Sequence, residues 1–426
     1  MPILLTHAHV VGPNEFDGDI RIDNGVISAL GTDLLPDADT TVIDAHHQTV
    51  MPGLVDVHVH FREPGYTDKE TIKTGAAAAA HGGFTTVVAM PNLEPVPDNV
   101  DALTALIAKN QSDAKIHVRQ FAAITKGLHS ADLNNYRALK AAGALGFSND
   151  GVGVQDAATM LAAMKAAKAV DAPIAAHIED EGLMNHGVIN AGPAAERLHL
   201  PGIPGVAESA QLARDLELAN LTGVHYHACH VSTKESVALI RAAKQRGINV
   251  TAEATPHHLL LDETDITSDN PMFKMNPPLR EPADREALIA GLLDGTIDMI
   301  ATDHAPHTVA DKQGTFATAS FGIVGSETAF ALLYTRLVTT GVCSLNQLID
   351  WMSTAPAKAF GLPAGTIAVG QPADLTIADL TQTTAINPDD WLAKGHNSPF
   401  IGQQVQASIL MTIAGGRIAY QTEGKF

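Results

Sequence analysis

Two histidines separated by a single residue, His58 and His60, could together hold a metal ion. In an extended strand alternate side chains share a face, so Asp56, His58 and His60 should point one way and the valines between them the other. Neutral imidazole is a common ligand of Zn²⁺ and similar ions. Because two half-exposed strand histidines would show the same spacing, this motif needs support from the rest of the chain.

Further candidate ligands stand where other predicted strands end. Asp150 follows a fourth strand, and Asp303 closes an eighth. His177 closes a fifth strand, and His230 closes a sixth. In a barrel of parallel strands these ends lie on one rim. We therefore expect four histidines and two aspartates to meet there and to bind two divalent ions, with Zn²⁺ as the expected metal and a carboxylate as the bridge.

The elements that would position these residues alternate between short strands and helices, which predicts an α/β chain with a (β/α)₈ TIM-like barrel. Strands are expected at 54–60, 85–90, 116–123, 144–148, 173–177, 224–230, 248–254 and 297–302. Helices are expected at 67–80, 100–109, 133–142, 155–170, 206–219, 234–245 and 284–293. Thr67 and Glu70 have the spacing of a capping box for the first helix, and Ser232 is the expected cap of the helix that starts near Lys234.

The two ends of the chain carry strand patterns of a different kind, separated by hairpin turns such as Asn24-Gly25 and Gly415-Gly416. Either end alone would bury too little surface to be stable. We therefore expect residues 1–51 and 365–426 to pair in one small composite β-sandwich domain, beside a metal-dependent barrel at 52–364. Strands are expected at 3–11, 19–23, 26–30, 41–44, 375–377, 405–413 and 417–420.

Composition excludes several classes of protein. The chain is 45% hydrophobic and 17% charged, which is typical of a globular protein rather than a disordered one. Its net charge of -20 argues against binding to nucleic acid or to an anionic membrane. No apolar run reaches the roughly 18 residues of a membrane helix, and the first residues lack the basic region of a signal peptide. With only two cysteines, Cys229 and Cys343, a reducing cytoplasm is the simplest setting.

These motifs resemble those of the amidohydrolase superfamily and, within it, of the class I or long bacterial dihydroorotases. The resemblance is carried by residues 56–65 (DVHVHFREPG), by Met90-Pro91-Asn92 and by residues 302–307 (TDHAPH), and it spans essentially the whole chain. It implies a zinc-dependent enzyme of pyrimidine synthesis that converts N-carbamoyl-L-aspartate to L-dihydroorotate and back.

The resemblance also implies roles for individual residues. His58, His60 and Asp303 would bind one zinc, and His177 and His230 the other, with Asp150 as the bridge. Many relatives bridge the ions with a carboxylated lysine instead, so this departure leaves open whether one or two zinc ions are bound. The implied substrate contacts are His60, Arg62, Asn92, Asn276, His307 and the Phe321-Gly322 backbone.

The chemistry of a cyclic amide agrees with these roles. The ring carbonyl is a poor electrophile, so a metal-bound hydroxide is expected as the nucleophile in hydrolysis, with the metal as Lewis acid. Asp303 is the expected general acid and base. Arg62 could grip the substrate carboxylate with paired hydrogen bonds, while Asn92, Asn276 and His307 would supply neutral donors. Residues 311–320 are typical of a mobile loop that could exclude water.

Other interpretations remain open for several residues. Arg62 could be an ordinary surface ion-pair residue, and Asn276 a turn former. His257, His258 and His304 are expected behind the site or in the core. His7, His9, His46 and His47 are interpreted as surface or packing residues. The glycines at 151–153 and 322–325 lack the setting of a dinucleotide-binding loop.

Two rival functions remain. One is another cyclic-amide hydrolase, such as a dihydropyrimidinase or an allantoinase, whose substrate lacks the same carboxylate. The other is a catalytically silent paralogue that acts as a scaffold for a partner enzyme such as aspartate transcarbamoylase, although such paralogues usually lose ligands. A homodimer and a possible transcarbamoylase partner are expectations from the family alone.

Overall fold

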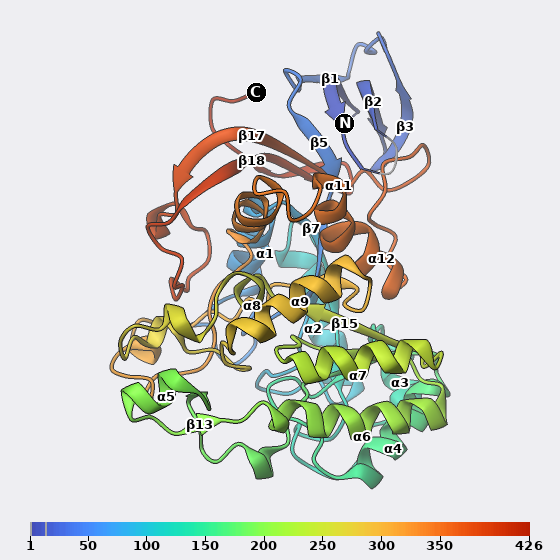
Figure 1. The fold of residues 1–426 in the computed structure, drawn as a ribbon. Helices are drawn as coiled ribbons and strands as arrows, with labels where there is room; N and C mark the ends of the chain where they lie inside the picture. The colour runs from blue at the N-terminus through green and yellow to red at the C-terminus, as the bar shows by residue number, and fades with distance from the viewer. Residues whose placement is uncertain (1, 13–14) are drawn as a thin grey trace.

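A barrel of parallel strands forms the centre of the computed structural model, which describes residues 2–12 and 15–426 (Figure 1). One parallel sheet has the order β6-β7-β8, and another has the order β16-β15-β14-β11-β10-β9. Strands β8 and β9 are separated only by Phe121, so they are two parts of one barrel strand. The bounds are β6 (Leu54–Val59), β7 (Phe84–Ala89), β8 (His117–Gln120), β9 (Ala122–Ala123), β10 (Phe147–Ser148), β11 (Ile174–Ala176), β14 (Tyr226–Ala228), β15 (Val250–Ala254) and β16 (Met299–Ile300).

The barrel closes between its first and last strands. Val59 and His304 form a parallel bridge, and the His60 amide donates to the His304 carbonyl at 2.9 Å. The Asp56 carboxylate accepts hydrogen bonds from the amide and the hydroxyl of Thr302. Each expected barrel strand is thus found near its expected position, and the predicted barrel is confirmed.

Helices surround the strands, with α6 and α7 side by side on the outside in Figure 1. The α-helices are α1 (Ile72–His81), α2 (Val100–Asp113), α3 (Tyr136–Ala141), α4 (Ala157–Lys168), α5 (Pro193–Leu198), α6 (Val206–Thr222), α7 (Lys234–Gln245), α8 (Pro256–Leu260), α9 (Pro282–Leu293), α10 (Ala329–Leu333), α11 (Leu345–Ile349) and α12 (Ala355–Ala359). Short 3₁₀ turns are η1 (Glu181–Leu183), η2 (Glu263–Asp265), η3 (Pro271–Phe273), η4 (Ala310–Lys312) and η7 (Pro388–Asp390), and π-helical turns are η5 (Tyr334–Val338) and η6 (Asp350–Thr354). Among the described residues, every helix is too short or too polar to cross a membrane.

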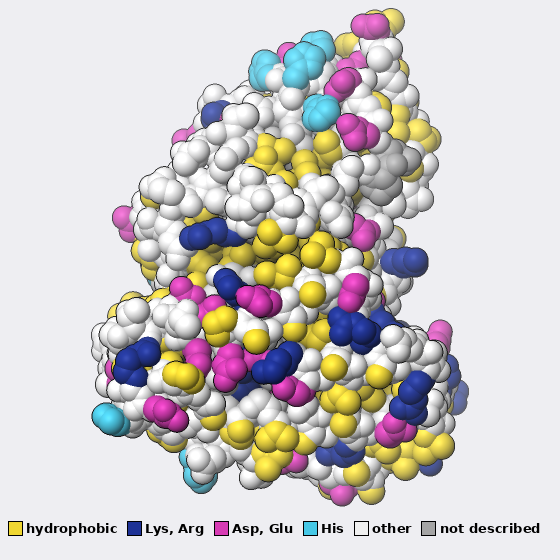
Figure 2. Space-filling model, viewed as in Figure 1, with side chains coloured by type: hydrophobic (Ala, Val, Ile, Leu, Met, Phe, Trp, Pro, Cys, Tyr) yellow, Lys and Arg dark blue, Asp and Glu magenta, His cyan; other side chains and the backbone are white. Residues whose placement is uncertain are grey.

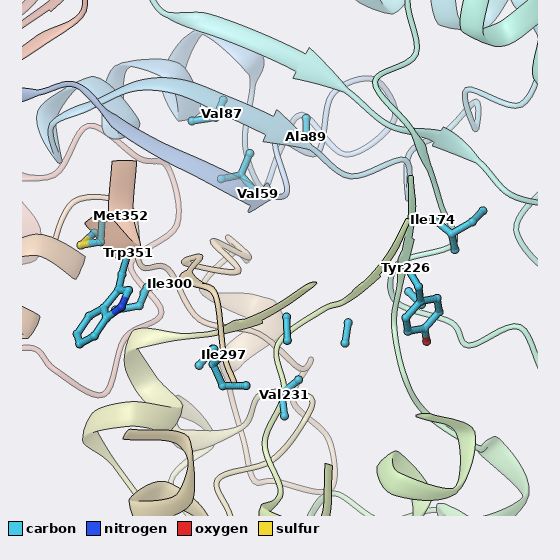
Figure 3. Packing of buried hydrophobic residues seen from close by; sticks show 14 of the residues in the cluster. Val59, Val87, Ala89, Ile174, Tyr226, Val231, Ile297, Ile300, Trp351 and Met352 are labelled. Atoms are coloured by element: carbon cyan, nitrogen blue, oxygen red, sulfur yellow. The ribbon is translucent and has the colours of Figure 1, made fainter. Parts of the chain in front are cut away.

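Apolar side chains fill both surfaces of the barrel wall. Between strands and helices lies a large cluster that includes Val59, Val87 and Tyr226 (Figure 3). A smaller cluster unites Val55 and Val57 with residues of other barrel strands and with Phe360. The register shifts between Asp56 and Val59, so the predicted strict alternation of the valines is wrong at Val59. After this shift the rings of His58 and His60 lie side by side at the strand end, with their centroids 5.3 Å apart.

A second sheet joins the two ends of the chain and lies at the top of Figure 1. Its order is β19-β18-β17-β5-β1-β2-β3, with β4 also paired to β1. The bounds are β1 (Ile3–Val10), β2 (Phe16–Asp23), β3 (Val26–Gly31), β4 (Thr41–Asp44), β5 (Thr49–Pro52), β17 (Leu375–Ala385), β18 (Gln404–Ala414) and β19 (Arg417–Gln421). A separate pair consists of β12 (Ile189–Asn190) and β13 (Gly202–Ile203). The exact domain boundaries at 51 and 364 stay a prediction.

Local sequence signals placed some turns correctly and some caps wrongly. Asn24 and Gly25 have φ of 53° and 83°, as the predicted hairpin turn requires. The first helix begins at Ile72, however, with Thr71 and Thr74 as its capping box. The predicted start at Thr67 is wrong because the Glu70 carboxylate is used otherwise, by the Thr74 hydroxyl and the Lys394 amide.

The cap of α7 also lies one residue from its expected position. Thr233 caps this helix by accepting from the Ser236 amide. Ser232, the predicted cap, instead accepts a hydrogen bond from Arg280 and contacts Glu208. Tertiary contacts therefore decided between two adjacent hydroxyl residues that are equally good caps.

Candidate metal centre

The six predicted metal ligands converge at one mouth of the barrel. His58 and His60 stand at the end of β6, Asp150 follows β10, and His177 follows β11. His230 and Asp303 follow β14 and β16. All six side chains are buried. Parallel strands end on the same rim, so residues up to 245 positions apart in the sequence become neighbours.

His58, His60 and Asp303 form one group of possible ligand atoms that lie within 4.8 Å of one another. Nε2 of His60 is 3.0 Å from Oδ1 of Asp303, and Nε2 of His58 is 3.5 Å from the same oxygen. Two nitrogens and one carboxylate oxygen around one point are a donor set that Zn²⁺ accepts.

Asp150, His177 and His230 form a second group of the same kind. Nδ1 of His177 and Nε2 of His230 are 3.0 Å apart, and Oδ1 of Asp150 lies 3.7 Å and 3.4 Å from them. The other oxygen of Asp150, Oδ2, is 3.3 Å from Nε2 of His60. The Asp150 carboxylate thus stands between the two groups, where a bridging ligand would have to lie.

Unpaired polar atoms test whether this donor set fits a cation. Nε2 of His58 and Oδ1 of Asp150 are buried in the centre without hydrogen-bond partners. Leaving such atoms unpaired costs roughly 1–3 kcal/mol each, unless another ligand satisfies them. A lone pair on nitrogen and a carboxylate oxygen are both donors to a metal ion. The buried histidines and aspartates are therefore able to bind metal.

The electrostatics of the group point the same way. Burial raises the pKa of Asp150, but the charge on His58 and hydrogen bonds from His177 and His230 outweigh it and hold that pKa well below its usual range. Burial also raises the pKa of Asp303, but the charges on His58 and His60 and the hydrogen bond from His60 outweigh it. They lower this pKa to about 2. Both carboxylates therefore stay ionised and require positive charge among them.

Outer hydrogen bonds orient the histidine rings. Nδ1 of His58 is 2.5 Å from a Glu253 oxygen, and Nδ1 of His60 is 2.8 Å from Oδ1 of Asn92. Nε2 of His177 is 3.3 Å from Glu179. Partners of this kind fix the tautomer of a ligating histidine and the angle of its ring.

Three residues at the same rim have a strained backbone. Arg62, His230 and Asp303 have φ of 60°, 34° and 49°, although none of them is glycine. Left-handed conformations cost a residue with a β-carbon on the order of 1–3 kcal/mol and persist where surrounding contacts impose them. All three residues line the cavity beside the centre.

A cavity of about 370 Å³ opens directly onto the candidate metal centre. All the predicted site residues except His58 line it, namely His60, Arg62, Asn92, Asp150, His177, His230, Asn276, Asp303, His307, Phe321 and Gly322. His58 lies behind them with no exposed surface. The volume suits a small ring rather than a polymer.

The polar groups of the cavity differ in what they can still offer. Asn92 accepts from His60 and keeps its amide hydrogens free. Asn276 donates one amide hydrogen to Glu179 at 3.0 Å, and its Oδ1 has no partner, so it offers an acceptor in addition to the donor expected from sequence. His307 uses Nε2 to donate to the Phe321 carbonyl at 2.7 Å, so it orients the backbone.

Gly322 is required by both conformation and space. Its φ is 126°, and a β-carbon would lie 2.8 Å from that of Ala305. The Asn397 amide donates to the carbonyls of Gly322 and Ala305, each at 3.0 Å. This wall of the cavity is therefore fixed by close packing.

Two buried lysines tether the loop that was predicted to be mobile. Nζ of Lys312 donates to the carbonyls of Lys274, Ser320 and Gly322 at 2.9–3.0 Å. Nζ of Lys274 donates to the carbonyls of Phe316 and Ala319 at 2.5 and 2.6 Å. The loop lies against the cavity in this structure, and its motion stays a prediction.

The Lys312→Met variant is expected to remove part of the pH dependence of stability. Burial, and then the charge of Lys274, lower the pKa of Lys312 to about 7. Between about pH 7 and 10 the unfolded chain binds the extra proton, so the free energy of unfolding should rise with pH, by at most about 1.4 kcal/mol per pH unit. Urea titrations at pH 7.5 and 9.5 measure this rise. Equal rises in wild type and variant would contradict it.

Several residues at the centre carried no clear sequence signal. Glu253 and Glu179 hold His58 and His177, yet an acidic residue within or after a strand is most often solvent-exposed. Asn397 and Lys274 had no recognisable motif either. Only their three-dimensional partners identify them.

Other candidate residues lie outside the inner group, as expected. His258 and His304 are buried behind it, where His258 contacts the Pro277 carbonyl and His304 accepts from the Gly325 amide. His7 and His46 lie on the far sheet beside Asp44 and are exposed. Figure 2 shows cyan histidines gathered at that end of the molecule.

Comparisons with known proteins agree with this geometry. A family model described as Dihydro-orotase-like matches residues 47–236. Dihydroorotase of Latilactobacillus sakei subsp. sakei is 58% identical over 407 residues, which cover 95% of each protein. Dihydroorotase of Pediococcus pentosaceus is 54% identical over 426 residues, which cover 100% of both.

Solved structures give a second comparison. L-Hydantoinase (dihydropyrimidinase) from Arthrobacter aurescens has a TM-score of 0.89 and 26% identity, covering 98% of this chain and 96% of that one. Dihydropyrimidinase from Brevibacillus agri has a TM-score of 0.87 and 25% identity, with 99% and 95% coverage. The likeness extends over both the barrel and the sheet that joins the two ends.

Proposed function

This chain belongs to the dihydroorotase family of hydrolases, and we propose that it interconverts N-carbamoyl-L-aspartate and L-dihydroorotate in the synthesis of pyrimidines. The observation that carries the proposal is the convergence of four histidines and two aspartates beside a cavity of about 370 Å³ that contains an arginine. The motif resemblance in the sequence predicted the same family.

We propose Zn²⁺ as the metal, with two ions per subunit. His58, His60 and Asp303 would hold one, His177 and His230 the other, and Asp150 would bridge them. Bound zinc supplies Lewis acidity that polarises a carbonyl and makes a bound water acidic near neutral pH. The support is the composition of the two donor groups and the unpaired atoms between them.

The substrate would be held on the opposite side of the cavity. Arg62 is half-buried, and desolvation lowers its pKa from the usual value, yet a guanidinium still keeps its proton. Its Nε donates to the Pro306 carbonyl at 3.3 Å, which leaves the other nitrogens for a carboxylate. The free amide hydrogens of Asn92 and the free oxygen of Asn276 could orient the polar ring atoms.

Asp303 would move the proton. Its Oδ1 faces His58 and His60, and its pKa is low, so the carboxylate is unprotonated and can act as a base. In ring closure it would take a proton from the carbamoyl nitrogen, and in hydrolysis it would return one to the departing nitrogen. Phe321, Gly322 and Ala305 form part of the cavity wall beside it.

A substrate panel tests this function. Purified protein should close N-carbamoyl-L-aspartate and open L-dihydroorotate, and elemental analysis should find about two zinc ions per chain. Turnover of dihydrouracil or allantoin in preference to dihydroorotate would favour the rival cyclic-amide hydrolases. A chain with little bound metal and no activity would favour the silent paralogue.

The Arg62→Met variant is expected to raise the KM for carbamoyl-aspartate about 10- to 100-fold, because hydrogen bonds to a charged group contribute roughly 1.5–3 kcal/mol. Steady-state kinetics measure this change. Arg119→Met, at an exposed arginine of β8, serves as the control and should leave KM unchanged. Unaltered turnover in Arg62→Met would favour substrates that lack the carboxylate.

The family also suggests the setting of the reaction. We propose a cytoplasmic homodimer, with aspartate transcarbamoylase as a candidate partner. Light scattering on the purified chain would give the oligomeric state, and titration with a transcarbamoylase would test association.

A further inference from the structure

Glu253 lies in the barrel interior directly behind the candidate metal centre. It belongs to β15 and has no exposed surface. Fully buried carboxylates are rare and need several donors. Three hydrogen bonds reach this one: from Nδ1 of His58 at 2.5 Å, from Nε2 of His227 at 2.9 Å and from the main-chain amide of His230 at 3.1 Å.

These three donors connect both halves of the centre. His58 belongs to the first group of possible ligands and His230 to the second. Glu253, on β15, therefore accepts hydrogen bonds from the ring of His58 and from the backbone of His230. His230 has a strained φ of 34°, which the hydrogen bond from its main-chain amide to Glu253 helps to impose.

A chain of hydrogen bonds continues from Glu253 through His227 and Thr251 to His225, and its contacts fit one set of neutral tautomers. A carboxylate can only accept, so His227 donates from Nε2, and in a neutral ring its Nδ1 accepts. Nδ1 of His227 is 2.8 Å from the Thr251 hydroxyl, which therefore donates to it. The same hydroxyl oxygen lies 2.8 Å from Nε2 of His225, from which it accepts. With both histidines neutral, every donor in this chain of hydrogen bonds faces an acceptor.

We propose that Glu253 is a positioning residue that fixes the proton of His58 on Nδ1, leaves Nε2 free toward Asp150 and Asp303, and thereby sets the zinc affinity of the centre. The inference rests on the proposed function, because it assumes that zinc binds where Nε2 of His58 points. Nε2 has no hydrogen-bond partner and lies 3.3 Å from Asp150.

A carboxylate accepts from both His58 and His227 at once, which an amide of the same shape cannot do. Glutamine offers one acceptor oxygen and an NH₂ group that only donates. If its oxygen accepts from His58, its NH₂ group faces the Nε2 hydrogen of His227. If it is turned round, the NH₂ group faces His58 and favours the tautomer with the proton on Nε2, which blocks the ligand atom.

The test compares zinc affinity in Glu253→Gln with that in wild type by competition with a chromophoric chelator. We expect zinc to bind 10- to 100-fold more weakly, the range found for such outer partners of metal ligands. Nitrogen-15 spectra of histidine-labelled, zinc-loaded protein give an independent readout. In wild type His58 should coordinate through Nε2, and in the variant that signal should weaken or split.

Two further variants separate positioning from general damage. Asp374→Asn removes another buried carboxylate with a histidine and an amide donor, at His117 and Gly415, but on the distant sheet. It should lower the melting temperature without changing zinc affinity. Glu253→Asp keeps the charge on a shorter side chain and should weaken zinc binding less than Gln does, which also covers the case that Glu253→Gln does not fold.

The outcomes distinguish the two proposals. A wild-type chain that binds no zinc overturns the proposed function and this inference together. Wild-type binding with unchanged affinity and unchanged His58 coordination in both Glu253 variants overturns the inference alone. Equal losses of affinity in Asp374→Asn and Glu253→Gln would also overturn it, because the effect would then be general destabilisation.

Discussion

Dialysis against a metal chelator is expected to lower ring-closing activity at least about 1000-fold, and added Zn²⁺ is expected to restore it. Lewis-acid stabilisation contributes several kcal/mol to the transition state, and each 1.4 kcal/mol is a factor of ten in rate. The remaining side chains could not compensate. Asp150 and Asp303 are ionised carboxylates, which cannot act as a Lewis acid on the substrate carbonyl.

Initial rates are measured before chelation, after chelation and during a stepwise zinc titration. They give the loss of activity on chelation and the number of zinc ions per chain that restores it. The end point of the titration would decide between one and two ions, which the presence of Asp150 rather than a carboxylated lysine left open. Circular dichroism of the chelated protein controls for unfolding. Full activity in protein shown by elemental analysis to be free of metal would contradict the prediction and the proposed function.

The barrel and its rim could be predicted because their signals are local. Each strand is short and largely apolar, and each candidate ligand stands where a strand stops, as His177 does after β11. Topology then converts a list of strand ends into one site, because all parallel strands of a barrel end on the same side. The periodicity of the chain alone was enough for this step.

Features that depend on partners distant in sequence could not be predicted. Glu253 holds His58, which is 195 residues away, and Lys274 donates to the carbonyls of Phe316 and Ala319 in the loop. The start of α1 was misplaced because Thr67 and Thr71 are equally good caps in isolation, and the contacts of Glu70 with Thr74 and with Lys394 decide between them.

Strand β5 was missed for a related reason. Thr49–Pro52 is short and ends in proline, which usually argues against a central strand. The structure pairs it with β1 on one side and with β17 on the other, so it joins the two ends of the chain. A strand of four residues is stable there only because both neighbours are present.

The Asp303→Asn variant is expected to lose about 10³- to 10⁴-fold in kcat while remaining folded. Asparagine keeps an oxygen that could ligate zinc, but it cannot accept a proton, and general acid–base catalysis contributes typically 10²–10⁴-fold. The loss of a charged ligand adds to this effect. Measurement of kcat in both directions, with zinc content determined on the same samples, separates a missing base from a missing ion.

The matched control is Asp298→Asn, at a carboxylate beside the opposite end of the same strand. Asp298 accepts from the Ala252 amide at 2.8 Å and from Nζ of Lys244 at 2.7 Å, and it does not line the cavity. This control should lower stability and leave kcat near that of wild type. If Asp303→Asn keeps its zinc and retains more than about a tenth of wild-type kcat, another group must move the proton. Asp150, the remaining carboxylate of the centre, would then be the residue to test.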